Sequence, residues 1–448
     1  MTASTLAVRA GMIALALVVS AKDAIGDESS EDGAALGLAI GNRYGLSLLG
    51  TDKDKPHLDV TPYGQVNQTV MVTGDGRETD TFIVDNNSSS SRLGITARLI
   101  TATPWSLGFQ YEAGIDSPGT TTVRATDGSR TRPFVAGDND PFTRLLRGWV
   151  DGPYGRLTAG KSFPVIGNWI PNPGRTFATD QASYFLSGGA FNPVISNPTD
   201  SRLRLVRPWT AYAAPMQWPL TLPLLLVRYD SPAFAGLSFS AAVAENHVYD
   251  FGLRYKVQAG RLALDASVAF HKNQSPDFDS GRPGFPDFEE SLVGGFGLRD
   301  VPTGLFGVLG ANYRMFDGSD PNDFDGDGNR RPDDFSLWGQ FGLRRNLFGI
   351  GDTVIYGVLG YGHDRGEGRG VPGTNGSRWL KTRVLMTGVN VIQELDVAKT
   401  FGTRLDLYAG YRRWHGDFVR TTSSADLSPF PEGIDDLHIV TSGFRLRF

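Results

Sequence analysis

The sequence predicts an all-β protein, a single transmembrane antiparallel barrel of about 16 strands. Segments with strand-like alternation recur from about residue 57 to the end. Short links alternate along the chain with long loops rich in Gly, Pro and Asp. The final strand pattern, from Val440, runs to the terminal Phe448 without a polar tail. A closed barrel explains such an ending, because its last strand must pair with its first.

The amino terminus has the features of an export signal. Arg9 supplies a positive charge, residues 11–19 form a short apolar core, and small residues precede a cleavage point after Ala21. A buried amino-terminal helix is the alternative. No stretch reaches the roughly 18 to 20 apolar residues of a membrane-spanning helix. We therefore expect a signal over residues 1–21, a segment of uncertain structure over 22–55 and a barrel over 56–448.

Composition limits the classes that remain. The chain of 448 residues has no cysteine, so no disulfide framework holds it together. Its mean hydropathy of −0.21 is too low for a membrane-embedded helix bundle. A barrel tolerates this value, because only every second strand residue faces lipid. A net charge of −5 without a basic tract predicts no nucleic-acid partner.

The individual strands show an apolar face and a mixed face. In residues 261–271, the side chains of one face run from Leu262 to Phe270 and are all apolar, whereas the other face carries Asp265 and His271. The same pattern recurs in residues 105–112, 237–244, 249–257 and 404–412. A soluble sandwich also alternates, but the segregation of short links from long loops favours the barrel. About 16 strands would leave a water-filled lumen.

Several motifs resemble the general porins of Gram-negative bacteria, particularly the alphaproteobacterial kind. PYGQVNQTVMV (62–72) is similar to the first strand of that family, and DNNSSSSRLGI (85–95) to its second-strand signature. Residues 143–161 resemble the hairpin before the long third loop, and residues 227–242 resemble a later hairpin. The motifs occur in the family's order along the chain.

This resemblance implies a 16-stranded barrel that forms a homotrimer among outer-membrane lipids, with its third loop folded into the lumen. The implied function is passive diffusion of small hydrophilic solutes and ions through a water-filled channel, without catalysis. The implied location is the cell outer membrane. The terminal strand resembles the signal read by the barrel assembly machinery, carried here by Phe444, Leu446 and Phe448.

The family's pore constriction sets wall arginines against carboxylates on the third loop. The residues that match or fit this constriction are Arg92, Arg144, Arg202, Arg204 and Asp180. By alternation, Arg144 and Arg147 lie on opposite faces of one strand, so one of them should face lipid or a subunit contact. The arginines could also merely solvate the lumen. Asp180 is the only carboxylate of the loop, about residues 162–199, and this predicts an anion preference.

One loop matches a calcium-binding pattern. Asp323, Asp325 and Asp327 alternate before a glycine, Asn329 offers a carbonyl, and Asp334 stands at the twelfth position. Arg331 fits the ninth position poorly, and a solvated acidic loop is the alternative. Calcium would make this loop rigid, and no other cofactor is expected.

The chain carries no recognisable catalytic arrangement. Its six histidines are scattered singly, and no Gly-x-Ser-x-Gly motif occurs. Three alternatives to a general porin remain open: a substrate-specific outer-membrane channel, an outer-membrane barrel enzyme and a secreted all-β adhesin. The sequence leaves the solute preference undetermined.

Overall fold

The computed structural model describes residues 56–115, 119–120, 143–168, 223–273, 290–315, 333–367, 380–398, 403–421, 427–429 and 433–448. These residues form strands almost throughout. The strand segments are β1 (His57–Gly74), β2 (Thr79–Asp85), β3 (Arg92–Ile100), β4 (Ser106–Gly114), β5 (Thr143–Gly152), β6 (Gly155–Ser162), β7 (Leu224–Asp230), β8 (Leu237–Ala244), β9 (Val248–Ala259), β10 (Leu262–Asn273), β11 (Glu290–Asp300), β12 (Leu305–Met315), β13 (Asp334–Arg345), β14 (Thr353–Glu367), β15 (Leu380–Ala398), β16 (Thr403–Thr421), β17 (Leu427–Pro429) and β18 (Leu437–Arg447).

The 18 segments occupy 16 positions around one closed sheet. Segments β2 and β3 pair with successive parts of β1, so they are two halves of one interrupted strand. Segments β17 and β18 share β16 in the same way. Every pairing between named strands is antiparallel, and β18 returns to β1. The predicted all-β antiparallel barrel of about 16 strands is confirmed.

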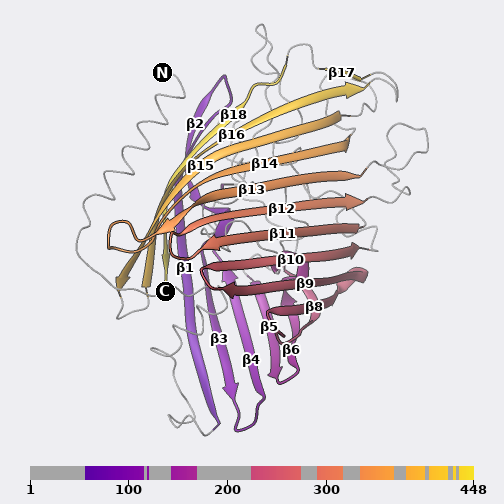
Figure 1. Ribbon diagram of the computed structural model, residues 1–448, viewed down its shortest axis with the longest axis vertical. Helices are drawn as coiled ribbons and strands as arrows, with labels where there is room; N and C mark the ends of the chain where they lie inside the picture. The colour runs from indigo at the N-terminus through magenta and orange to yellow at the C-terminus, as the bar shows by residue number, and fades with distance from the viewer. Residues whose placement is uncertain are drawn as a thin grey trace.

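Closure joins the two ends of the described chain. Strand β18 lies beside β1 (Figure 1), with Val66 opposite Leu446 and Val72 opposite Val440. The amide of Gly64 donates to the carbonyl of Phe448 at 2.9 Å, and the amide of Phe448 donates back at 3.0 Å. Backbone groups at both edges of the sheet therefore find partners, which removes the cost of open edges.

The short links gather at the end of the barrel that holds Phe448. After β3, β5, β7, β9, β11 and β13 the chain reverses within a few residues. Between β9 and β10 the reversal uses Gly260 and Arg261, and Gly260 has φ +58°. At the opposite end, β4, β6, β10, β12 and β14 lead into longer connections, while β1–β2 and β8–β9 are joined by short ones. This segregation agrees with the predicted layout.

The outer face of the wall is apolar. On β4, Leu107, Phe109 and Tyr111 are 36–47% exposed, whereas Ser106 and Glu112 on the other face are 6% and 4% exposed. The other strands repeat this arrangement, with exposed leucine, valine and phenylalanine along the outside. Contiguous apolar surface of this extent is unfavourable in water, at about 25 cal/mol per Å². The barrel therefore carries its apolar side chains on the outside, the reverse of the arrangement in a soluble protein.

The inner wall is divided into two sides. Inward side chains on β3 to β7 are largely polar or charged. Across β11 to β16 many inward side chains are apolar and at most 6% exposed: Val293, Phe306, Val308, Trp338, Val354, Tyr356, Val358, Val384, Met386, Ile392 and Trp414. The same strands also carry buried inward polar and charged residues, among them Asn312, Gln340, Asn390 and Arg412, so this side of the wall is mixed in character and buried.

The chain enters the lumen directly after β6. The short helix α3 (Val165–Asn168) contacts β8, β9 and β10, and Val165 donates its amide to Asp250 Oδ2 at 3.1 Å. Gly252 leaves room for it, because a Cβ there would lie 2.9 Å from Val165 Cγ1. Asp250 also bonds the ring of buried His271. The first residues of the predicted third loop therefore lie inside the barrel, and residues 169–222 fall outside the described part.

No helix within the described ranges is both long enough and apolar enough to cross a membrane.

Deletion of Phe448 tests the closure. The truncated chain loses both backbone hydrogen bonds to Gly64 and the ring that covers this glycine. We expect less folded protein in membranes, measured as the fraction that migrates differently in gels before and after heating. Phe234→Ala is the control, because this ring is 84% exposed in a link far from the closure. Equal folded fractions for the deletion and the parent would show that the terminal residue is dispensable.

Candidate functional site: the charged inner wall

A bulge in β5 turns an additional arginine inward. Glu112 of β4 pairs with Leu145, whereas Ala113 pairs with Thr143, so Arg144 is an extra residue in the ladder. Arg147 lies on the regular inward face, opposite Gln110. Both arginines consequently reach inward groups of β4. The expectation that one of them faces lipid or a subunit contact was wrong, because it assumed uninterrupted alternation.

Glu112 joins two arginines from different strands. Its Oε1 lies 2.5 Å from Nη1 of Arg144, and its Oε2 lies 3.5 Å from Nε of Arg92. The carboxylate is nearly buried, with 5% of its side chain exposed. Arg144 also lies over the ring of Phe163, 5.3 Å from its centroid. One carboxylate thus holds Arg92 and Arg144 together at the point where the chain turns into the lumen.

A directed chain of hydrogen bonds links this pair to Arg147. Nε of Arg147 donates to Oε1 of Gln110 at 2.8 Å, and Gln110 Nε2 donates to the hydroxyl of Tyr63 at 2.6 Å. The hydroxyl of Tyr63 in turn donates to Glu112 Oε2 at 2.9 Å. Arg147 Nη1 donates to Ser162 Oγ at 2.9 Å. Because each donor has one acceptor along this chain, the amide orientation of Gln110 is fixed.

Near the short-link end, the arginines of this side have carboxylate partners. Asp151 accepts from Arg156 at 2.6 Å and lies 3.7 Å from Arg98. Arg228 bonds Asp230 at 3.0 Å, and Arg254 of β9 bonds Asp265 through both oxygens. The guanidinium of Arg156 additionally lies over the ring of Trp149, at 5.2 Å. Such bidentate and shared pairs fix the side chains against the wall.

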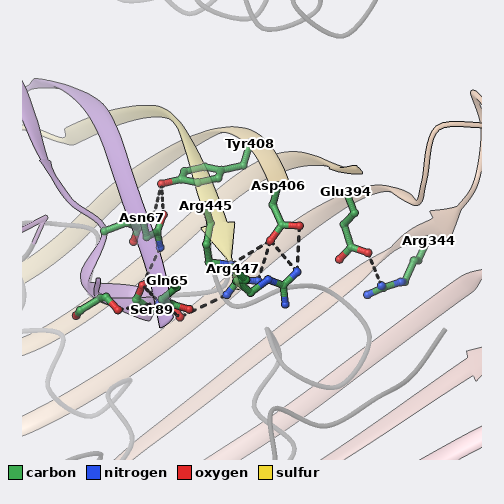
Figure 2. Close-up of polar contacts among 11 residues, drawn as sticks. Gln65, Asn67, Ser89, Arg344, Glu394, Asp406, Tyr408, Arg445 and Arg447 are labelled. Carbon is green, nitrogen blue, oxygen red and sulfur yellow. Dashed lines mark hydrogen bonds and ion pairs between the residues drawn. The ribbon is translucent and has the colours of Figure 1, made fainter. Parts of the chain in front are cut away.

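A third cluster lies at the closure. Figure 2 shows Asp406 of β16 between Arg445 and Arg447 of β18, at 3.0 and 2.9 Å. Arg344 of β13 bonds Glu394 of β15 at 2.7 Å. These pairs are almost fully buried, and breaking a buried pair leaves a costly unpaired charge. The cluster is therefore a structural element of the wall.

A serine-rich insertion lies on the same cluster. The break between β2 and β3 contains a 3₁₀ turn (Asn87–Ser89), and the carbonyl of Ser89 accepts from Gln65 and Asn67 of β1 at 2.6 and 2.9 Å. Tyr408 of β16 donates to Asn67 Oδ1 at 2.8 Å. The insertion is thus bound directly to β1, and Tyr408 links the same Asn67 to β16 (Figure 2).

The sequence-predicted residues divide into two groups. Arg92 and Arg144 meet at Glu112, and Phe444, Leu446 and Phe448 belong to the alternate positions that face outward at the end of β18, with both phenylalanines 40% exposed. The remaining constriction residues, Arg202, Arg204 and Asp180, lie outside the described residues. Sequence reasoning placed Gln110 and Glu112 on the polar face of their strand but did not select them, because alternation does not show which polar residues meet.

The calcium pattern is described only at its last residue. Asp323, Asp325, Asp327 and Asn329 lie outside the described ranges. Asp334 begins β13 and its buried carboxylate accepts from Arg314 Nη2 at 2.6 Å. A calcium ion would have to compete with this guanidinium for Asp334. The described residues contain no group of three or more potential metal ligands, so calcium stays a prediction.

Comparison with known proteins gives no family. No family model matches the sequence, and no curated protein matches it. Among solved structures, the anion-selective porin from Comamonas acidovorans is similar over 87% of this chain and 100% of its own, with 13% identity and a TM-score of 0.49. OmpF of Salmonella typhi in complex with daunomycin (88% and 99% coverage, 13%, 0.45) and the outer membrane channel DcaP of Acinetobacter baumannii (89% and 99%, 12%, 0.46) are also similar. At these TM-scores nothing about the site follows from the likeness.

Glu112→Gln tests the shared carboxylate. The variant leaves Arg92 and Arg144 without their common counter-charge, so we expect stability to fall by about 1–3 kcal/mol. The measurement is the denaturant midpoint of tryptophan fluorescence in detergent. Asp300→Asn is the control, because its partner Arg261 has a side chain that is 64% exposed, and such pairs contribute little. Equal midpoints for Glu112→Gln and the parent would mean that solvent already screens the three groups.

Proposed function

We propose that this chain is a porin of a Gram-negative outer membrane, a channel through which small hydrophilic solutes and ions diffuse passively. The observation that carries the proposal is the inverted polarity of a closed 16-position barrel, apolar outside and charged along one inner side. Lipid would solvate the outer face, and water and solutes would occupy the lumen beside the charged wall. The residues at that wall bind and orient, and we propose no catalytic role for them.

The charge of the wall supports an anion preference. Arg92, Arg144 and Arg147 face the lumen on β3 and β5. Glu112 contacts the first two, and Arg147 bonds only neutral oxygens among the described residues. Between low-dielectric walls, fixed charges act on a permeating ion more strongly than in bulk water. A solute anion passing this side would therefore be favoured over a cation of the same size.

Further proposals concern export and assembly. Residues 1–21 would direct the chain across the inner membrane, and the outward residues at the end of β18 would serve as the signal for the barrel assembly machinery. A homotrimer is supported by the sequence motifs that resemble general porins. We also propose that calcium binds the loop of residues 323–334. Proteolysis within that loop should then accelerate in chelator and slow again in calcium. Equal proteolysis rates with chelator and with calcium would contradict calcium binding.

A substrate-specific channel is the second candidate, because Arg147 on the inner wall bonds only neutral oxygens among the described residues and its charge would favour particular solute anions. Solute-competed conductance separates this candidate from a general porin, because a specific solute would block at low concentration. A hydrolysis assay on the purified protein tests the barrel-enzyme alternative.

Planar-bilayer recording tests the channel and its selectivity together. We expect stepwise conductance and a reversal potential of anion-preferring sign in asymmetric KCl. The double variant Arg92→Gln with Arg144→Gln should shift that potential towards cations. The shift should shrink at high salt, because the Debye length falls from about 10 Å at 0.1 M to about 3 Å at 1 M.

The matched control for this recording is Arg254→Gln with Arg228→Gln, which removes the same charge from arginines that each have their own carboxylate. Absence of conductance steps would contradict the channel. Steps with an unchanged potential in the first double variant would contradict the selectivity assigned to Arg92 and Arg144.

A further inference from the structure

Arg147 lacks a counter-charge. Its side chain is partly exposed on the inward face of β5. Its two hydrogen bonds, from Nε to Gln110 and from Nη1 to Ser162, both go to neutral oxygens. Within the described residues, no carboxylate lies within ion-pair distance of this guanidinium. Nη2 makes no hydrogen bond to the described residues, so its N–H groups are available to donate to a ligand.

The acids nearest in the ladder are already engaged. Glu112 is shared by Arg144 and Arg92, and Asp151 holds Arg156 and Arg98. On β7, Asp230 accepts from Arg228 and from Ser240. None of them can neutralise Arg147 without giving up an existing partner. A guanidinium held partly out of water without a counter-ion is unfavourable, and a small anion relieves that cost.

The β6 residue opposite Arg147 carries no side chain. It is Gly160, and the residue opposite Gly160 on β7 is Leu226. Gly160 has φ +114°, and a Cβ would stand 2.3 Å from the carbonyl oxygen of Leu146, so no larger residue fits there. Gly160 therefore places no side chain against the guanidinium. Ser162, two residues further along β6, already fixes the guanidinium plane through its hydroxyl.

We propose that Arg147 is the charged centre of a binding site for small oxyanions on the lumen wall. The carboxylate or phosphate group of a solute would accept from Nη2, and Gln110 and Ser162 would hold the guanidinium in one orientation. The planar guanidinium group, with its N–H groups in a fixed arrangement, matches the geometry of oxyanions. Its role in transport rests on the proposed function: anions would bind transiently at Arg147 and their flux would saturate.

Equilibrium dialysis with radiolabelled inorganic phosphate tests the site on folded, detergent-purified protein at low ionic strength. We expect saturable binding that weakens about tenfold or more in Arg147→Gln, equivalent to a loss of about 1.4 kcal/mol. Gln110→Glu should weaken binding comparably while keeping Arg147, because it sets a carboxylate where Nε of Arg147 now meets an amide oxygen at 2.8 Å. Heat-dependent gel migration verifies the folding of each variant.

Arg254→Gln is the charge-matched control. It removes the same charge from the inner wall, but Arg254 has its own carboxylate in Asp265, so binding should stay within about twofold of the parent. Three results would overturn the site: no saturable phosphate binding by the parent, unchanged binding in Arg147→Gln, or equal weakening in Arg254→Gln. The last result would indicate a diffuse effect of total charge.

Conductance separates this inference from the proposed function. Phosphate should reduce the chloride conductance of the parent with the half-saturation found by dialysis, and this block should disappear in Arg147→Gln. Conductance without phosphate binding would refute the binding site but not the channel function. Phosphate binding through Arg147 without any conductance would refute the channel function but not the binding site.

Discussion

The pairing of β18 with β1 is the constraint on which the rest of this structure depends. It converts a sheet with two open edges into a closed wall in which each strand position has two neighbours. Only a closed wall can expose leucine and phenylalanine on its outside while keeping charged groups inside, because an open edge in lipid would leave backbone groups unsatisfied. The ion pairs of Asp406 with Arg445 and Arg447 join the last strand to its other neighbour, β16.

Charge compensation inside the barrel is organised by position. At the short-link end and at the closure, each arginine described above contacts a carboxylate, so these clusters mainly hold neighbouring strands together. Around β3 to β5, Arg92 and Arg144 share Glu112, whereas Arg147 bonds only neutral oxygens among the described residues. The unbalanced charge therefore stands where the chain enters the lumen through α3. The arginines that hold strands together and Arg147 are thus the same residue type. They differ in whether a described carboxylate contacts the guanidinium.

The inward residues of β11 to β16 are mixed in character and buried. Val354 and Met386 are fully excluded from solvent, and polar side chains of the same strands are buried as well. Residues with so little exposed area cannot line an open passage. Solutes in the lumen are therefore expected to meet the partly exposed arginines of the other side, Arg92, Arg144 and Arg147.

Local patterns in the sequence determined the class of fold, the approximate strand segments and the alternation of short links with long loops, because each depends on residues within one segment. The tertiary structure decided the rest. The bulge that brings Arg144 onto Glu112 depends on the register between two strands, and the strand itself gives no sign of it. The partners of Glu112 come from β1, β3 and β5. Cross-strand register fixes these contacts, and register is a property of the closed sheet.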